Sequence, residues 1–381
     1  MIRLGDVAHF EMGQAPPGIE CNTARDGVLF VKAGEFGSTH PVEREWTTKP
    51  LKFGRKGDVF VCVVGATAGK LNLGIDCAIG RSVAAIRPSA KLDARFLYYQ
   101  LHPWVLKLRV ASAGSAQGVI TKKQLAAIGI TLPTLEEQTG IVAEIEKQFS
   151  RLDEAVANLN RVKTNAQHFK RATIQAQTAS NSFSTKIAGT VADIAVSLDN
   201  MREPVNKTER AKRVGTIPYL GANGQTGWID EARFDEELVL VVEDETFVGR
   251  KLPFSYYFSG KCWVNNHTHV LRARSDAVLP KYLNLALSYY PFIPLTTGST
   301  GRRKLTKAAL MSAPIVVPDL ATQHRIVAEV DRRLSIVREV ESEVDANLKR
   351  AQVLRQAVLA RAFAPPGATC AGQSEHVVAT A

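Results

Sequence analysis

Two long stretches of the chain repeat apolar residues at alternating spacings of three and four positions. In the first stretch these residues are Val142, Ile145, Phe149, Leu152, Val156 and Leu159. In the second they are Val327, Val330, Leu334 and Val337. This spacing places the apolar side chains along one face of a helix, as in the seam of a coiled coil. The pattern therefore predicts two long amphipathic helices.

Polar residues mark where both helices begin. Thr134 and Glu137 have the spacing of a capping box directly after Pro133, because each side chain can bond a backbone N–H of the other residue. Asp319 is placed to cap the second helix directly after Pro318. We expect both helices to start at these positions.

Charge is distributed unevenly along the first predicted helix. Residues 136–154 carry six acids and two bases, whereas 155–178 carry four bases and no acid, which suits the helix dipole and an antiparallel partner. The second helix ends with four bases in 349–361, but its first turns are mixed. We infer an antiparallel pair of spacer helices, each roughly 65 Å long. The alternative is that each seam packs only onto its own globular unit.

The two halves of the chain repeat one another at an offset of 185 residues. At this offset 121–125 matches 306–310, Pro133 matches Pro318, Gln138 matches Gln323, 141–145 matches 326–330, and 166–167 matches 351–352. Weaker echoes join 27–30 to 215–218, Cys77 to Cys262, and 96–101 to 282–287. Each half is therefore expected to be one globular unit followed by one long helix.

The globular halves have the pattern of mixed strands and short helices. Residues 58–64 and 238–242 are typical of buried strands, and 281–287 has helical spacing. We predict an α+β fold with a pseudo-twofold repeat: a first globular unit over 1–133, a helix over 134–180, a second unit over 181–318 and a helix over 319–363. The small and polar residues 364–381 are expected to be a disordered tail.

Composition adds a preference for a polyanionic partner. The 381 residues include 48 Lys and Arg against 37 Asp and Glu, a formal charge of +11, which favours nucleic acid or an anionic membrane surface; ordinary solubility charge is the alternative. No stretch approaches the roughly 18 apolar residues of a membrane span. Five scattered cysteines without a C-x-x-C pair indicate reduced thiols. We expect a soluble cytoplasmic protein with no membrane partner.

The motifs of DNA-modifying enzymes are missing or incomplete. An adenine methyltransferase needs a Gly-rich cofactor loop and an Asn or Asp before Pro-Pro and an aromatic residue, yet 16–17 and 365–366 follow Ala and precede Gly. Residues 65–70 are one residue short of a phosphate loop, and Leu71 stands where Ser or Thr is required. That segment is a turn, or a loop near DNA phosphate. We predict no catalytic residue and no cofactor in this chain.

Two acidic or histidine-rich segments could suggest a metal. Residues 243–245 and Lys251 resemble the carboxylates and lysine of a metal-dependent nuclease, but the first half has Val-Gly-Ala at 64–66, so a solvated loop is the better interpretation. His267 and His269 could share a strand face but lack a third ligand of suitable spacing. We expect ordinary hydrogen bonds there and no metal site.

The remaining candidate chemistry is the reading of DNA. Arg and Lys bond guanine, Asn and Gln bond adenine, and further bases anchor phosphates. The candidate DNA-binding residues of the second half are Asn223, Gln225, Arg250, Lys251, Asn266, Ser299, Arg302 and Arg303. Those of the first half are Lys32, Glu35, Thr67, Lys70, Arg81, Ser115 and Gln117. Because the sequence pattern of the two halves repeats while these side chains differ, we expect the halves to read different half-sites. The alternative for any single residue is neutral sequence change on a solvated loop.

A globular unit closed by Pro, Gln and an Ile-Val-Ala-Glu helix, twice over, resembles the specificity subunit of type I restriction-modification systems. The resemblance covers about residues 1–363. It is carried by 219–224 (YLGANG), 263–267 (WVNNH), 297–300 (TGST) and the helix start 132–138 (LPTLEEQ). The second helix start, 319–322, lacks the acidic pair, and the first unit fits the family less well.

The resemblance implies two target-recognition domains held apart by an antiparallel helix pair, each reading one part of a split site on double-stranded DNA. It also implies two DNA methyltransferase (modification) subunits and restriction/translocase subunits as partners in a prokaryotic cytoplasm. These partners would use S-adenosylmethionine, ATP and Mg²⁺, and this chain would be non-catalytic. The alternatives are a reader serving another type of restriction-modification enzyme, a coiled-coil scaffold without DNA specificity, and a nuclease.

Overall fold

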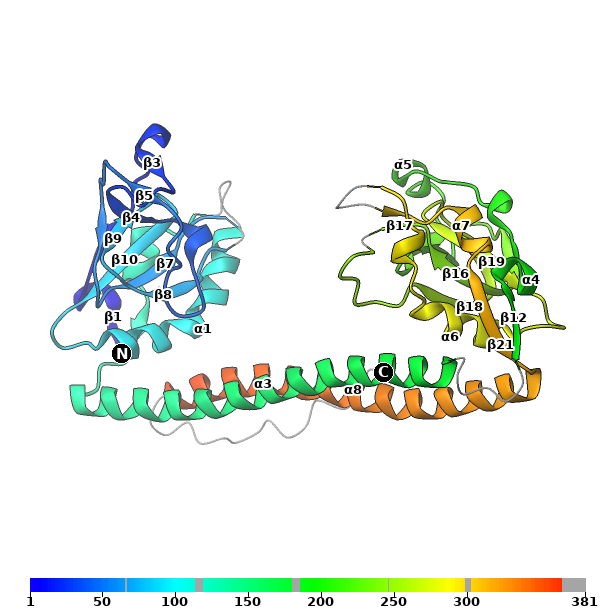
Figure 1. The fold of residues 1–381 in the computed structure, drawn as a ribbon. Coiled ribbons are helices and arrows are strands. Elements are labelled where there is room, and N and C mark those ends of the chain that lie inside the picture. The colour runs from blue at the N-terminus through cyan, green and yellow to red at the C-terminus, as the bar shows by residue number, and fades with distance from the viewer. Residues whose placement is uncertain (66, 114–118, 180–185, 246, 299–302, 365–381) are drawn as a thin grey trace. The chain divides into compact units, whose positions relative to one another are not determined.

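The computed structural model describes residues 1–65, 67–113, 119–179, 186–245, 247–298 and 303–364. Backbone contacts divide the chain into two compact units, which we call unit 1 (1–159 with 346–381) and unit 2 (160–345). Both units include part of each long helix, α3 (Leu135–Thr178) and α8 (Leu320–Ala362) (Figure 1). Both helices lie within the predicted ranges 134–180 and 319–363, whereas the predicted tail lies almost entirely outside the described residues.

Unit 1 is built around two small sheets. The four-stranded sheet has the order β2 (Ala8–Met12), β10 (Val83–Pro88), β7 (Val59–Cys62), β8 (Leu71–Leu73), with antiparallel neighbours. The five-stranded sheet has the order β3 (Cys21–Asn22), β5 (Trp46–Thr47), β4 (Val28–Val31), β9 (Cys77–Ile79), β6 (Phe53–Gly54). The unit also contains β1 (Ile2–Arg3) paired with β11 (Gly129–Ile130), η3 (Ala33–Glu35), α1 (Ala94–Ala113) and α2 (Lys122–Ala126). All four residues of β7 are buried, as its unbroken apolar run predicts.

Unit 2 is built around one larger sheet. Its order is β13 (Ala195–Ser197), β19 (Thr268–Ala273), β16 (Phe234–Val242), β18 (Ser255–Val264), β14 (Ile217–Gly221), β15 (Gly224–Ile229). Two strand pairs join β12 (Lys186–Thr190) to β21 (Pro314–Pro318) and β17 (Asp244–Glu245) to β20 (Arg303–Lys304). The helices are α4 (Val191–Ile194), η5 (Asp199–Met201), α5 (Lys207–Arg210), α6 (Pro280–Ser288), η6 (Ile293–Leu295) and α7 (Lys307–Met311). The predicted strand at 238–242 and helix at 281–287 are confirmed as parts of β16 and α6.

The weak sequence echoes correspond to equivalent elements of the two units. Strand β4 pairs in parallel with β9, and strand β14 pairs in parallel with β18. The similar segments 27–30 and 215–218 overlap the starts of β4 and β14, which are therefore equivalent strands. Cys77 and Cys262 lie in the second strand of each parallel pair and are both buried. The predicted α+β class with an internal repeat is confirmed.

A fully buried glutamine fixes α8 to unit 2. The side-chain oxygen of Gln323 accepts the backbone N–H of Leu279 at 2.8 Å. Its side-chain nitrogen donates to the carbonyl oxygens of Ala277 at 3.1 Å and Pro318 at 2.8 Å. These bonds join the first turns of α8 to the segment that leads into α6.

The repeat places the same bonds in unit 1. The side-chain oxygen of Gln138 accepts the backbone N–H of Asp93 at 2.7 Å. Its nitrogen donates to the carbonyl oxygens of Lys91 and Pro133, both at 2.9 Å. Gln138 is also fully buried, so the repeated Pro and Gln of the sequence form one recurring junction between a long helix and its globular unit.

The helix caps lie where the sequence placed them. The Glu137 N–H donates to the Thr134 hydroxyl at 3.3 Å, and the Thr134 N–H donates to the Glu137 carboxylate at 2.8 Å. Asp319 accepts the backbone N–H of Thr322 at 2.9 Å. The predicted capping box and the predicted Asp cap are therefore both present.

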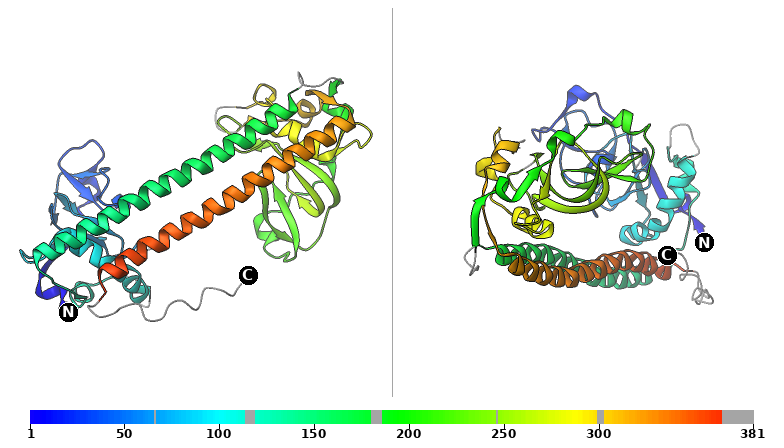
Figure 2. Two further views of the ribbon diagram at one scale, coloured as in Figure 1. Left: turned by 90° about the horizontal axis from the view of Figure 1, so that it is seen from below. Right: turned by 90° about the vertical axis from the view of Figure 1, so that its right-hand side faces the viewer.

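Within each unit α3 and α8 run antiparallel, which confirms the predicted pairing (Figure 2). In unit 1 Arg355 of α8 forms an ion pair with Asp153 of α3. In unit 2 the Lys163 ammonium lies 2.8 Å from Asp345, and a second ion pair joins Lys170 to Glu341 at 2.5 Å. Residue numbers fall along one helix as they rise along the other. The acidic first half of α3 therefore lies beside the basic end of α8, as the antiparallel prediction requires.

The first turns of each long helix also pack onto the globular unit that precedes them. Val142 belongs to the main core of unit 1, and Ile326 and Val330 belong to the main core of unit 2. Further along α3, Ile145 and Phe149 pack against Leu359 of α8. The apolar seam therefore packs onto the preceding globular unit in the first turns and onto the opposite helix further along. The alternative, that each seam packs only onto its own globular unit, holds for the first turns alone.

Candidate nucleic-acid interface

In unit 2, four loops that carry predicted DNA-binding residues contact one another. Hydrogen bonds join the backbone of Asn265 to Leu220 at 2.9 Å, and Glu243 to both His267 at 3.1 Å and Leu305 at 2.7 Å. The guanidinium of Arg250 donates to the Asn223 side-chain oxygen at 2.7 Å and to the Pro253 carbonyl at 3.0 Å. These contacts join the described residues of four loops into one continuous region: 221–224, 243–254, 265–267 and 296–305.

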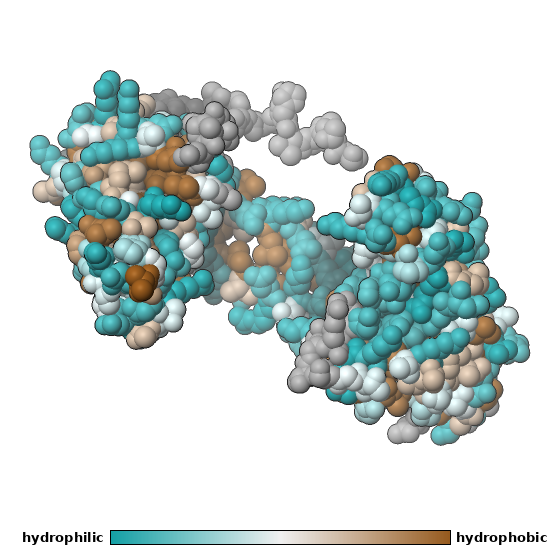
Figure 3. Space-filling view, turned by 90° about the horizontal axis from the view of Figure 1, so that it is seen from above, coloured by the Kyte–Doolittle hydropathy of each residue, from teal (hydrophilic) through white to brown (hydrophobic). Residues whose placement is uncertain are grey.

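Several predicted residues of this region are exposed. Asn266, Lys251 and Gln225 are all solvent-accessible, and Gln225 donates to the Gly227 carbonyl at 3.2 Å. Arg303 instead supports its own loop, because its guanidinium donates to the Thr296 hydroxyl at 2.7 Å and carbonyl at 2.9 Å. Ser299 and Arg302 lie outside the described residues. Hydrophilic residues cover most of the visible face of unit 2 in Figure 3.

A buried charge network supports these loops from beneath. His269 is 1% exposed; its Nδ1 lies 2.6 Å from Asp199, and its Nε2 donates to the Leu305 carbonyl at 2.8 Å. Arg202 contacts Glu243 at 2.5 Å, and the Lys304 ammonium lies 3.1 Å from the same carboxylate. Hydrogen bonds and opposite charges therefore join η5, β19 and β20 to the residues that directly follow η5 and β16.

The carboxylates of this network are held in their charged form. Burial alone would raise the pKa of Asp199, but the hydrogen bond and charge of His269 outweigh it and the pKa is lowered. Burial likewise opposes ionisation of Glu243, yet Arg202, His269 and Lys304 together lower its pKa. Glu243 thus forms ion pairs with Arg202 and Lys304. Its side chain is buried, so the expected solvated loop is wrong for this residue.

His269 of β19 and His267, directly before this strand, make the hydrogen bonds that the sequence favoured. His267 Nδ1 lies 2.6 Å from Asp244, and His269 is bound by Asp199. Within the described ranges, no three His, Cys, Asp or Glu residues are grouped so as to hold a metal ion. Every helix in the same ranges is too short or too polar to cross a lipid bilayer.

In unit 1 the predicted residues that the structure describes lie on one connected group of loops. Glu35, 8% exposed, accepts the backbone N–H of Lys32 at 3.0 Å. The hydrogen bond that the Lys32 ammonium donates to the Glu45 carboxylate raises the pKa of Lys32. The Lys70 ammonium donates to the Phe36 carbonyl at 2.5 Å. Thr67 Oγ1 lies 3.2 Å from Cys62 Sγ. Arg81 is exposed, and Ser115 and Gln117 lie outside the described residues.

One basic and aromatic group in unit 2 was missed from the sequence. Guanidinium groups lie over aromatic rings, with Arg210 4.5 Å from the Tyr219 ring centre and Arg213 and Arg233 at 4.6 and 4.8 Å from that of Trp263. The segment that carries Arg210 and Arg213, residues 206–213, holds four bases among eight residues. This density of basic residues was the signal that the sequence offered. The aromatic rings that orient the guanidinium groups lie outside this segment, in β14 and β18.

Comparison with known proteins places this fold and these loops in one family. The model of the type I restriction modification DNA specificity domain matches residues 1–164 and 189–346. The chain therefore belongs to the type I restriction-modification DNA specificity family, and the resemblance noted in its sequence is confirmed.

Two relatives each match less than half of the chain. A Haemophilus influenzae protein described as a type I restriction enzyme specificity subunit is 33% identical over 43% of this chain and 41% of its own length. A Methanocaldococcus jannaschii protein, the MjaX specificity subunit, is 34% identical over 38% of this chain and 35% of its own length. The matched part thus spans less than half of either relative.

Solved structures match nearly the whole fold. A chain from a study of assembly and conformational transition of the type I R-M system has a TM-score of 0.70 at 20% identity, covering 95% of this chain and 96% of that one. The HsdS subunit from Thermoanaerobacter tengcongensis has a TM-score of 0.52 at 19% identity, with 95% of each chain covered. At this identity the matches show a shared fold.

Proposed function

We propose that this chain is the DNA-reading subunit of a type I restriction-modification complex and that each unit contacts one part of a split target. The observation that carries the proposal is a repeated frame beneath loops that differ. Gln138 and Gln323 make equivalent buried bonds, whereas the connected loops present Asn223 and Asn266 in unit 2 and Lys32 and Arg81 in unit 1. Two copies of one frame with different polar loops suit two different half-sites.

Catalysis in this proposal belongs to partner subunits. The acidic group at 243–245, which could have indicated a nuclease, places Glu243 against Arg202 and Lys304. The sequence also lacks the methyltransferase motifs. Two methyltransferase subunits with S-adenosylmethionine, and restriction subunits with ATP and Mg²⁺, would therefore act around this chain in the cytoplasm.

The proposal is tested by exchanging one recognition segment. The chain is co-expressed with a cognate methyltransferase, and methylated adenines are mapped across the genome. Replacing residues 181–318 with those of a relative should change one half of a split motif and leave the other half unchanged. Absence of methylation, or a continuous motif that ignores the exchange, would favour the scaffold interpretation instead.

A single exposed asparagine should contribute to one half-site. Asn266→Ala is expected to relax base preference within one half of the target by roughly ten- to a hundredfold, because a paired amide contact discriminates bases by about 1–3 kcal/mol. Asn160→Ala, on the exposed surface of α3, is the matched control. Selection from random duplexes measures the preference; an equal loss on all sequences would identify a phosphate contact instead.

A further inference from the structure

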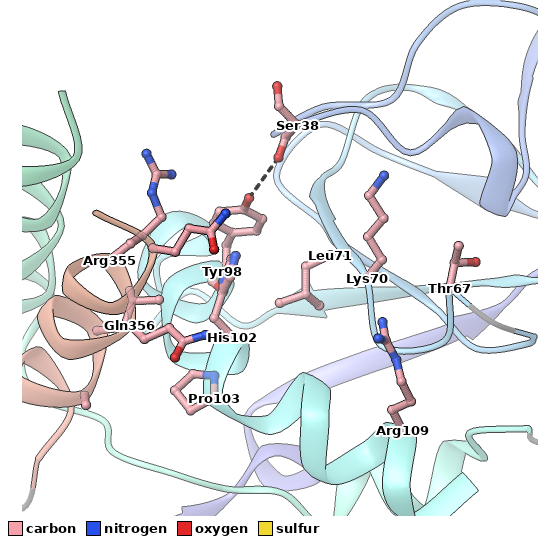
Figure 4. Close-up of a pocket in the computed structure, with 13 residues that line it drawn as sticks. Ser38, Thr67, Lys70, Leu71, Tyr98, His102, Pro103, Arg109, Arg355 and Gln356 are labelled. Carbon is pink, nitrogen blue, oxygen red and sulfur yellow. Dashed lines mark hydrogen bonds between the residues drawn. The ribbon is translucent and has the colours of Figure 1, made fainter. Parts of the chain in front are cut away.

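Unit 1 contains a cavity of about 770 Å³ between the last turns of α8 and its globular part. Its polar lining includes Thr67, Lys70, His102, Arg109, Arg355 and Gln356. Figure 4 shows Arg355 and Gln356 reaching in from α8, and Lys70, Thr67 and Arg109 on the other side. Tyr98, which donates to the Ser38 carbonyl at 3.5 Å, lies between them.

Unit 2 contains a cavity of about 510 Å³ in the corresponding place, next to the last turns of α3. Arg171 and Gln175 of α3 line one side, and Arg250 with the rings of Phe247 and Tyr289 lines the other. The guanidinium of Arg171 lies over the Tyr289 ring, 5.4 Å from its centre.

The two cavities are equivalent by element and by sequence. In each unit the loop base follows a glycine in the left-handed region, Gly69 (φ 86°) before Lys70 and Gly249 (φ 74°) before Arg250. Gln356 stands 185 residues after Arg171, the offset of the whole repeat. The internal repeat therefore contains an equivalent cavity in each unit, although the side chains that line the two cavities differ.

Both cavities offer donors and positive charge. Among the described residues that line them there is no Asp or Glu, whereas Lys70, Arg109 and Arg355 line one and Arg171 and Arg250 the other. These cations also have protein contacts: Arg355 pairs with Asp153, and Lys70 donates to the Phe36 carbonyl. An anion with several acceptor oxygens would add to these contacts and meet no carboxylate in the wall.

We propose that each cavity binds a phosphate of the DNA backbone, held between a loop of the globular part and the last turns of a long helix. This inference rests on the proposed function. DNA is favoured over a small anion because both cavities are open and adjoin the reading loops: Arg250 bonds Asn223, and Lys70 bonds the carbonyl next to Glu35. Phosphate contacts of this kind fix register and carry no sequence preference.

The test adds a carboxylate without removing a protein contact. Gln356 and Gln175 are exposed on their helices, so Gln356→Glu and Gln175→Glu leave the core intact. Binding of the full chain to a random-sequence duplex is titrated at several salt concentrations. Each variant should weaken binding by roughly tenfold at low salt and make the salt dependence shallower by about 0.9 of a log unit per log unit. Gln356→Lys should strengthen binding.

Gln167→Glu, on the exposed surface of α3 outside both cavities, is the control and should bind as the unmodified chain does. The proposal is overturned if the cavity variants match this control, or if they bind DNA normally but lose the methyltransferase subunit, which would make the cavities protein-docking sites. Because the duplex is random in sequence, the outcome is independent of whether the chain reads a split target.

Discussion

Replacing Gln323 with leucine is expected to lower the free energy of unfolding of unit 2 by about 3 kcal/mol. The leucine fills similar space but leaves the Leu279 N–H and the carbonyl oxygens of Ala277 and Pro318 without their partner. Each buried backbone group that loses its bond costs roughly 1–3 kcal/mol. The loss should appear in unit 2, because the bonds join α8 to the segment before α6.

The repeat supplies the matched comparison. Gln138→Leu should destabilise unit 1 to a similar extent, while Gln167→Leu on the exposed surface of α3 should change little. Hydrogen exchange resolved by peptide, in increasing denaturant, separates the two units. Equal protection of the 277–290 peptides in Gln323→Leu and the unmodified chain would refute the proposed role of this junction.

Asp199→Ala is expected to destabilise unit 2 by about 3–5 kcal/mol, the usual cost of removing one partner from a buried ion pair, because the Asp199 carboxylate lies 3.5 Å from the largely buried guanidinium of Arg202. The change leaves His269, which is 1% exposed, without the carboxylate 2.6 Å from its Nδ1, and removes the acceptor of the Val270 N–H. Glu236→Ala, which breaks an exposed pair with Arg272, is the control and should cost no more than about 1 kcal/mol.

The same network predicts how acid affects unit 2. The folded-state pKa values of Asp199 and Glu243 are lowered from their ordinary values of 3.8 and 4.5. Their contribution is therefore complete above about pH 4.5 and is lost as the pH falls through the lowered values. The stability of unit 2 should fall in this acid range, and the fall should be smaller in Asp199→Ala. An identical acid profile in the two proteins would contradict this assignment.

The sequence predicted the long helices well because their signals are local. The heptad spacing and the caps at Thr134 and Asp319 depend on residues a few positions apart, and the caps determine where α3 and α8 begin. The internal repeat predicted the junction residues Gln138 and Gln323 as a pair. It could not give their role, because the bonds reach Asp93 and Leu279, more than 40 residues away.

The candidate interface was predicted less completely. Asn223 and Arg250 were chosen by residue type, and the structure brings them together. Glu35 and Arg303 were chosen on the same basis, yet both bond to their own loops. The roles of Asp199 and Arg202 depend on contacts across about 40 to 70 residues of sequence, and no local pattern carries that information. Residue type thus identified the loops better than it identified the exposed side chains.

The division of the chain into units also determines the order in which they can be completed. Unit 2 is one continuous stretch, 160–345, whereas unit 1 combines 1–159 with residues from 346 onward. Phe363 packs edge-on against Phe96, with ring centres 5.4 Å apart, and Leu359 packs with Ile145. During synthesis these contacts of unit 1 can form only after residues 359–363 have left the ribosome, and therefore only after the whole of unit 2 has been made.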